Sequence, residues 1–130
     1  MKVSNNTMIK FGNVRLGDRK FPAAMQLALI SNSEAITNAL KPYYEVYRGI
    51  VEKCAKKDEN GEVEVAENGD VTIEDTETLA KELNELSETE VEVPITMIPK
   101  HVFERCCDDP AFDTPSVAET AAMSFFIEKE

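Results

Sequence analysis

The stretch PAAMQLALISNSEAITNALKPYYEVYRGIVEKCAKK, residues 22–57, decides the fold of this chain. In it, apolar or small side chains recur at seven-residue spacing in two interleaved series, Leu29, Ile36, Tyr43 and Ile50, and Ser33, Leu40, Tyr47 and Cys54. This spacing places one stripe along the face of a helix. Pro22 suits a first helical turn, whereas Pro42 interrupts a helix that reaches Leu40. We therefore expect two helices that break near Pro42.

Ahead of these helices, residues 8–16 predict a β-hairpin. Ile9 and Phe11 alternate with Lys10, and Val14 and Leu16 alternate with Arg15. A two-residue turn at Gly12-Asn13 would bring the four apolar side chains to one face, and Gly17-Asp18 supplies a second break.

Behind the helices, residues 62–73 predict a second hairpin, which is strongly acidic. Turn register favours a three-residue loop, Glu67-Asn68-Gly69, because it pairs Val65 with Val71 and Val63 with Ile73. In that turn, Gly69 takes the left-handed conformation. A two-residue loop would instead mix the apolar and polar faces.

The rest of the chain predicts one short strand and three helices. Asp75 or Thr76 caps a helix over 76–86, and a strand follows over 91–97, which Pro94 confines to a sheet edge. A short helix is expected near 100–106. Thr114 is expected to cap a last helix over 115–127, with Pro115 in its first position.

These elements predict a single α+β domain over residues 1–130, with a kinked helical pair and a C-terminal helix packed with small antiparallel hairpins. The helical pair should pack against the last helix. Four further side chains should contribute to the core: Met97, Phe103, Phe125 and Ile127.

Charge is segregated along the chain, which carries a formal net charge of −11. Residues 1–57 hold ten Lys and Arg against four acids, whereas residues 58–92 hold fourteen acids and one base, Lys81. Such a field favours a basic protein partner and disfavours nucleic acid. A cluster of Tyr43, Tyr44 and Tyr47 with nearby lysines could stack on single strands, but pairing of those lysines with the acidic segment is the stronger expectation.

Bulk composition suggests an intracellular protein. Three cysteines do not make a disulfide framework and fit a reducing environment. The N-terminal residues show no signal peptide, and the longest apolar run, around 23–30, is too short to span a membrane.

Few residues offer catalytic or metal-binding chemistry. His101 with Cys106 or Cys107 could form a nucleophilic pair, oriented by Glu104 or Asp108. At a spacing of five residues, however, His101 and Cys106 do not share a helix face.

Metal binding has little support either. Zinc ligation by His101 and the three cysteines Cys54, Cys106 and Cys107 lacks the usual close spacing, and residues 58–62 fit a turn better than a calcium loop. No phosphate-binding glycine motif is present. We expect no catalytic residue, metal or cofactor.

One part of the chain resembles small uncharacterised proteins of bacteriophages and prophages. The resemblance is carried by Phe21-Pro22, Asn32, Leu40, Tyr43-Tyr44, Arg48 and the run Lys57-Asp58-Glu59-Asn60-Gly61, and extends by pattern over roughly residues 20–100. In those proteins, a helix ending in KKDENG precedes a short hairpin, a further helix and an alternating segment. The resemblance implies a viral origin and a bacterial cytoplasm as the working environment, and it implies no catalytic residue.

Together, these observations lead to three hypotheses of function. The first is a non-enzymatic, phage-encoded inhibitor whose acidic hairpin occupies the basic, nucleic-acid-binding surface of a host protein, such as a defence nuclease. Its binding residues would be Glu62, Glu64, Glu67, Asp70, Glu74 and Asp75. The second is a virion or tail assembly accessory protein that binds through exposed apolar residues, and the third is a small cysteine-dependent enzyme. The sequence leaves the oligomeric state open.

Overall fold

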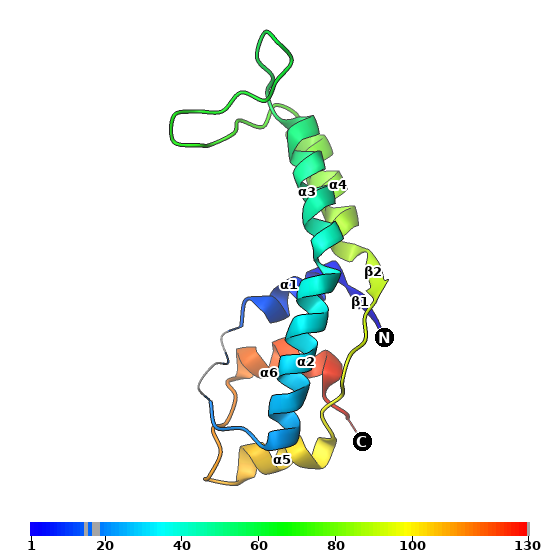
Figure 1. Cartoon of the computed structure of the whole chain (residues 1–130), viewed down its shortest axis with the longest axis vertical. Helices are drawn as coiled ribbons and strands as arrows, with labels where there is room; N and C mark the ends of the chain where they lie inside the picture. The colour runs from blue at the N-terminus through cyan, green and yellow to red at the C-terminus, as the bar shows by residue number, and fades with distance from the viewer. Residues whose placement is uncertain (15, 17–18, 130) are drawn as a thin grey trace.

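The computed structural model describes residues 1–14, 16 and 19–129 and shows an α+β fold (Figure 1). Its elements are β1 (Lys2–Ser4), α1 (Asn5–Gly12), α2 (Ala23–Ala39), α3 (Lys41–Cys54), α4 (Thr76–Glu88), β2 (Glu90–Glu92), α5 (Lys100–Asp108), α6 (Val117–Met123) and a 3-10 turn, η1 (Ser124–Phe126). Strands β1 and β2 form an antiparallel sheet in which Val3 lies opposite Val91. No helix in the described part of the chain combines the length and apolar character needed to cross a bilayer.

The molecule consists of a body and a projecting arm (Figure 1). The arm is the antiparallel pair α3 and α4, and the chain between these helices forms two loops at its far end. Helices α1, α2, α5 and α6 make up the body. The first part of the acidic segment, residues 58–75, therefore lies at the end of the arm, away from the main core.

The break between α2 and α3 confirms the interpretation of Pro42. Leu40 separates the two helices, and Pro42 lies in the first turn of α3, where its missing N–H removes no helical bond. The apolar stripe divides at this point, because α2 buries five residues whereas α3 buries only Cys54. The body consequently uses the first half of the stripe, and α4 covers the second half.

The body has one apolar core, contributed mainly by α1, α2, α5 and the C-terminal turn. Met8, Met25, Ile98, Met123 and Phe126 are fully buried in it. Phe11 meets Phe126 edge to face, with ring centroids 5.2 Å apart. The predicted core residues Met97, Phe103, Phe125 and Ile127 are partly buried against this cluster, as expected.

The predicted hairpin over residues 8–16 is wrong where the structure describes it. Residues 5–12 form α1, in which the hydroxyl of Ser4 accepts a hydrogen bond from the Thr7 N–H and caps the helix. Met8 and Phe11, one helical turn apart, are buried. Asn13 ends the helix by donating its N–H to the Ile9 carbonyl, 3.1 Å away, so Gly12-Asn13 is a helix terminus rather than a hairpin turn. The remaining predicted hairpin residue Arg15 and the break at Gly17-Asp18 lie outside the described residues.

The predicted strand over 91–97 is cut short to β2, which ends at Glu92. Val93 still donates its N–H to the Met1 carbonyl, but Pro94 has no N–H to continue the ladder. Beyond it, the side chain of Asn32 on α2 takes the place of a neighbouring strand. Its Oδ1 accepts from the Thr96 N–H at 2.7 Å, and its Nδ2 donates to the Thr96 carbonyl at 2.9 Å.

The last helix also begins later than predicted. Ser116, rather than Thr114, is the cap of α6, because Ser116 and Glu119 form a capping box. Pro115 lies before the cap and is buried, and Thr114 donates its hydroxyl to the Cys107 carbonyl. The helix ends at Met123, so the predicted range 115–127 contains α6, the 3-10 turn and the bridge from Ile127 to Ile98.

Candidate functional site

The candidate site is the acidic lobe, residues 55–75, at the end of the arm. Three short extended segments meet there through the antiparallel pairs Ala55–Ile73, Lys57–Val63 and Val65–Val71. The first pair closes the base of the lobe, and each of the others closes a turn. The two turns are the loops that diverge at the end of the arm in Figure 1.

Both turns are three-residue loops of the same type. Gly69 has φ +88°, and Ala66 donates to the Asp70 carbonyl across the loop Glu67-Asn68-Gly69 at 2.8 Å. This confirms the predicted loop and the pairing of Val65 with Val71. The predicted pairing of Val63 with Ile73 is wrong, because the segment that leaves α3 pairs with both residues and separates them.

Glycine substitutions should show which backbone positions this lobe requires. Gly69→Ala should lower the free energy of unfolding of the turn by about 1 kcal/mol, because only glycine adopts a positive φ without strain. Gly49→Ala, in the open middle of α3, should instead raise stability by up to about 1 kcal/mol through helix propensity. Chemical denaturation of both variants, with amide exchange to localise the change, measures this opposite response. Equal effects would contradict the turn assignment.

The structure brings the six predicted binding residues together on this lobe, and all six are exposed. Three of them already have partners. The Glu64 carboxylate lies 3.6 Å from the Lys56 ammonium, Asp70 accepts a hydrogen bond from the Asn68 amide, and Asp75 caps α4 by accepting from the Thr78 N–H.

The bond from Thr78 to Asp75 also holds the pKa of the Asp75 carboxyl below its usual value. Within the described residues, the carboxylates of Glu62, Glu67 and Glu74 have no hydrogen-bond or ion-pair partner. Of the six predicted binding residues, these three are the most available to another molecule.

The basic end of α3 pairs with the acidic segment, as the sequence predicts. Lys53 forms an ion pair with Glu82 on α4 at 2.5 Å, and this hydrogen bond raises the pKa of Lys53. Lys57 donates instead to the Glu52 carbonyl. Residues 58–75 contain eight acids and no base, so these contacts leave the outer part of the lobe strongly negative.

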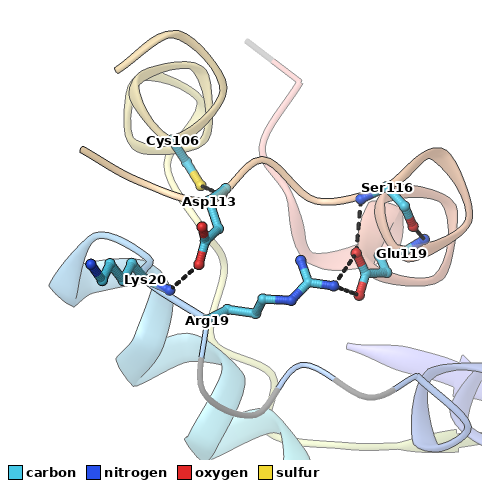
Figure 2. A network of polar contacts seen from close by, with 6 residues as sticks. All are labelled: Arg19, Lys20, Cys106, Asp113, Ser116 and Glu119. Carbon is cyan, nitrogen blue, oxygen red and sulfur yellow. Dashed lines mark hydrogen bonds and ion pairs between the residues drawn. The ribbon is translucent and has the colours of Figure 1, made fainter. Parts of the chain in front are cut away.

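A second polar cluster joins the segment before α2 to the α5–α6 connection (Figure 2). One nitrogen of the Arg19 guanidinium donates to both carboxylate oxygens of Glu119, at 2.9 and 3.2 Å. Glu119 also accepts from the Ser116 N–H, and that bond, with Arg19, keeps the pKa of Glu119 below its usual value. Lys20 and Asp113 exchange hydrogen bonds nearby. These bonds tie the segment before α2 to the α5–α6 connection, and we therefore interpret the cluster as structural.

The residues of the cysteine hypothesis all lie on α5. The Cys106 thiol is buried and donates to the Asp113 carbonyl, 3.2 Å away (Figure 2). Burial raises its pKa to about 11, which keeps it protonated at neutral pH. His101 and Cys107 are exposed, and no hydrogen bond links His101 to either cysteine in the described part of the chain.

Alkylation of the folded chain tests this arrangement. Iodoacetamide should modify Cys107, slowly because its pKa is also raised, and should reach Cys54 and Cys106 only after unfolding. Peptide mapping before and after denaturation measures the pattern. Rapid labelling of Cys106 in the folded protein would favour a nucleophile there.

The ligands of the zinc hypothesis lie at two ends of the molecule. Cys54 ends α3 beside the acidic lobe, whereas His101, Cys106 and Cys107 lie on α5 in the body (Figure 1). Among residues 1–14, 16 and 19–129, no group of three or more His, Cys, Asp or Glu side chains is arranged to hold a metal ion.

Sequence reasoning missed one signal in the lobe. Glu-Asn-Gly occurs at 59–61 and again at 67–69, each followed by an acid and valine. This short repeat encodes the two equivalent turns, since Gly61 and Gly69 both have positive φ.

Comparison with known proteins gives no match: no protein-family model fits this chain, and neither curated proteins nor solved structures show significant similarity to it.

Proposed function

We propose that this protein is a non-enzymatic binding protein that presents its acidic lobe to a basic protein surface. The observation that carries the proposal is the position of residues 58–75, with eight acids and no base, on a lobe held beyond the body by the arm. A surface that normally binds nucleic acid is the basic surface of matching character, because it is built to neutralise a row of phosphates. An inhibitor encoded by a bacteriophage would act in this way on a host nuclease.

The arm and the lobe suit this role in two respects. Backbone hydrogen bonds from Asp58 to Glu62 and from Ala66 to Asp70 close the two turns within the chain itself, which favours a shape formed before binding. The ion pairs Lys53–Glu82 and Lys56–Glu64 add to these contacts. The acids with free carboxylates then generate a field that accelerates encounter with a positive surface. Val65, which is exposed and lies between the two turns in the sequence, adds an apolar side chain to the charged lobe.

Charge reversal of the three free acids tests the proposal. The variant Glu62→Lys/Glu67→Lys/Glu74→Lys should bind the partner about 100-fold more weakly, since losing charge-matched contacts of this kind costs about 3 kcal/mol. Tagged wild-type and variant chains are used to capture proteins from bacterial lysate, with salt elution and mass spectrometry. A supporting partner is captured by the wild-type chain, elutes at high salt and is displaced by a DNA or RNA oligonucleotide.

A matched control separates the lobe from net charge. Glu45→Lys/Asp108→Lys/Glu128→Lys makes the same change in total charge at exposed positions outside the lobe. It should retain the partner within a few-fold. If the control loses the partner as completely as the lobe variant, overall charge is responsible and the lobe is a solvated surface.

A second candidate function, in virion or tail assembly, is favoured by exposed apolar side chains. Leu27 and Ile30 on α2 are 63% and 64% exposed, and Tyr44, Val46 and Tyr47 on α3 are also exposed. An interface through these residues would hold at high salt and would resist nucleic-acid competition. Leu27→Ser/Ile30→Ser should abolish retention of phage structural proteins in that case and should leave binding through the acidic lobe unchanged.

A further inference from the structure

The two turns of the acidic lobe carry a chemically labile pair of residues, asparagine followed by glycine, at 60–61 and 68–69. Glycine has no Cβ to hinder its backbone nitrogen as that nitrogen approaches the preceding side chain. In deamidation, this nitrogen loses its proton and bonds to the asparagine Cγ, and the side-chain nitrogen leaves as ammonia. Water then opens the cyclic imide to aspartate or isoaspartate, and no other reactant is consumed.

The attacking nitrogens are restrained equally in the two turns. The Gly61 N–H donates to the Asp58 carbonyl at 3.0 Å, and the Gly69 N–H donates to the Ala66 carbonyl at 2.9 Å. Both glycines have similar positive φ, +80° and +88°. The backbone therefore does not distinguish the two sites.

The asparagine side chains differ in their hydrogen bonds. Asn68 Oδ1 accepts from the Asp70 N–H at 3.1 Å, and Asn68 Nδ2 donates to the Asp70 carboxylate at 2.9 Å. The carboxamide of Asn60 makes no hydrogen bond within the described residues. In its turn, the backbone N–H groups of Asn60 and Glu62 donate to the Asp58 carboxylate instead.

This difference originates in the residues that flank the shared tripeptide. The first turn is preceded by Asp58 and followed by Glu62, whereas the second is preceded by Ala66 and followed by Asp70. Asp58 supplies the acceptor that organises the first turn. Ala66 occupies the corresponding position of the second turn and offers no side-chain acceptor. The Asn68 side chain accepts the backbone bond in that turn instead, and the short Asp70 side chain can reach it.

We propose that Asn60 is a site of spontaneous deamidation in the folded protein and that Asp70 protects Asn68 from the same reaction. The product adds a ninth carboxylate to the eight of residues 58–75. Where it is isoaspartate, it also lengthens the backbone inside a three-residue turn. The proposal does not depend on the lobe having a binding partner.

Timed incubation of the full chain at mildly alkaline pH tests it. The tryptic peptide of residues 58–81 contains both asparagines, and fragmentation in the mass spectrometer assigns the mass gain to one of them. Asn60 should react roughly fivefold faster than Asn68, the factor expected from one net hydrogen-bond restraint on the slower site. In urea the two rates should converge, because the tripeptide is the same.

Two exposed variants identify the protecting group. Asp70→Ala should raise the rate at Asn68 toward that of Asn60, because it removes the carboxylate partner and keeps only the backbone N–H bond. Glu62→Ala should leave the rate at Asn60 unchanged. Circular dichroism confirms that both variants keep their helices. Equal rates in the folded wild-type protein, or a slower reaction of Asn68 in Asp70→Ala, would overturn the proposal, the latter because the carboxylate would then be assisting the reaction.

Discussion

Replacing Asn32 by alanine should lower the free energy of unfolding by about 3 kcal/mol, because it leaves the N–H and carbonyl of Thr96 without partners and opens a small cavity. Asn32 is wholly buried, and its carboxamide is the group that bonds this stretch of backbone after β2 ends. Urea denaturation of the wild type and the variant measures the change. Asn38→Ala, on the exposed face of the same helix, is the control and should alter stability by no more than about 0.5 kcal/mol.

The variant Asn32→Asp gives a sharper test of the same contact. Aspartate keeps an oxygen that accepts from the Thr96 N–H. When the carboxylate is ionised, its other oxygen replaces the amide donor and repels the Thr96 carbonyl oxygen. Burial should raise the pKa of this carboxyl above its value in the unfolded chain, so its protonated form favours folding. The variant should therefore be less stable than the wild type at neutral pH and should recover part of the loss as pH falls through that raised pKa. A pH-independent loss would show that Thr96 is not the partner.

The second large effect concerns the Arg19–Glu119 pair. Glu119→Ala should destabilise the protein by about 2 kcal/mol, since it removes both the capping box of α6 and the ionic partner of Arg19, which is itself one-third exposed. Arg19→Met should cost about 1 kcal/mol. A double-mutant cycle built from Arg19→Met, Glu119→Gln and the variant that combines them isolates the coupling of the two side chains. Strictly additive losses would mean that the two groups do not interact in solution.

The same pair gives the protein a defined response to acid. The Ser116 N–H, followed by Arg19, holds the pKa of Glu119 below its ordinary value of 4.5. A carboxyl whose pKa is lower in the folded chain contributes stability above its unfolded pKa and loses that contribution as pH falls through the folded value. Stability should accordingly decline below about pH 4.5 with a slope that is smaller in Glu119→Gln.

Long periodic patterns and turn chemistry could be predicted from the sequence. The helices on either side of Pro42, the helix capped by Asp75 and the Glu67-Asn68-Gly69 loop are present in the structure. The hairpin predicted over 8–16 is wrong over residues 8–12, because four alternating residues do not distinguish a strand from a helix and the decisive cap, Ser4, lies before the segment.

Contacts between distant segments were beyond prediction. Asn32 is polar and belongs to no periodic pattern that would mark it as buried. Its role depends on Thr96, which lies 64 positions further along the chain. Arg19 and Glu119 are 100 positions apart. The candidate site was predictable to a greater extent because its acids are local in sequence. Of the six predicted binding residues, three have intramolecular partners, Glu64, Asp70 and Asp75, and three do not, Glu62, Glu67 and Glu74. The sequence could not show this division.

The arm is formed by one continuous stretch of chain, and this affects the order in which the protein folds. Residues 41–88 leave the body after Leu40 and return at Thr89, so contacts within the arm close loops that lie inside this segment, such as the 29 positions between Lys53 and Glu82. By contrast, pairing β1 with β2 joins Val3 to Val91 and requires closure of most of the chain. Loop-closure entropy rises with chain separation, which makes such pairings slow to form. We expect α3, the acidic lobe and α4 to assemble early, with the N-terminal strand docking last.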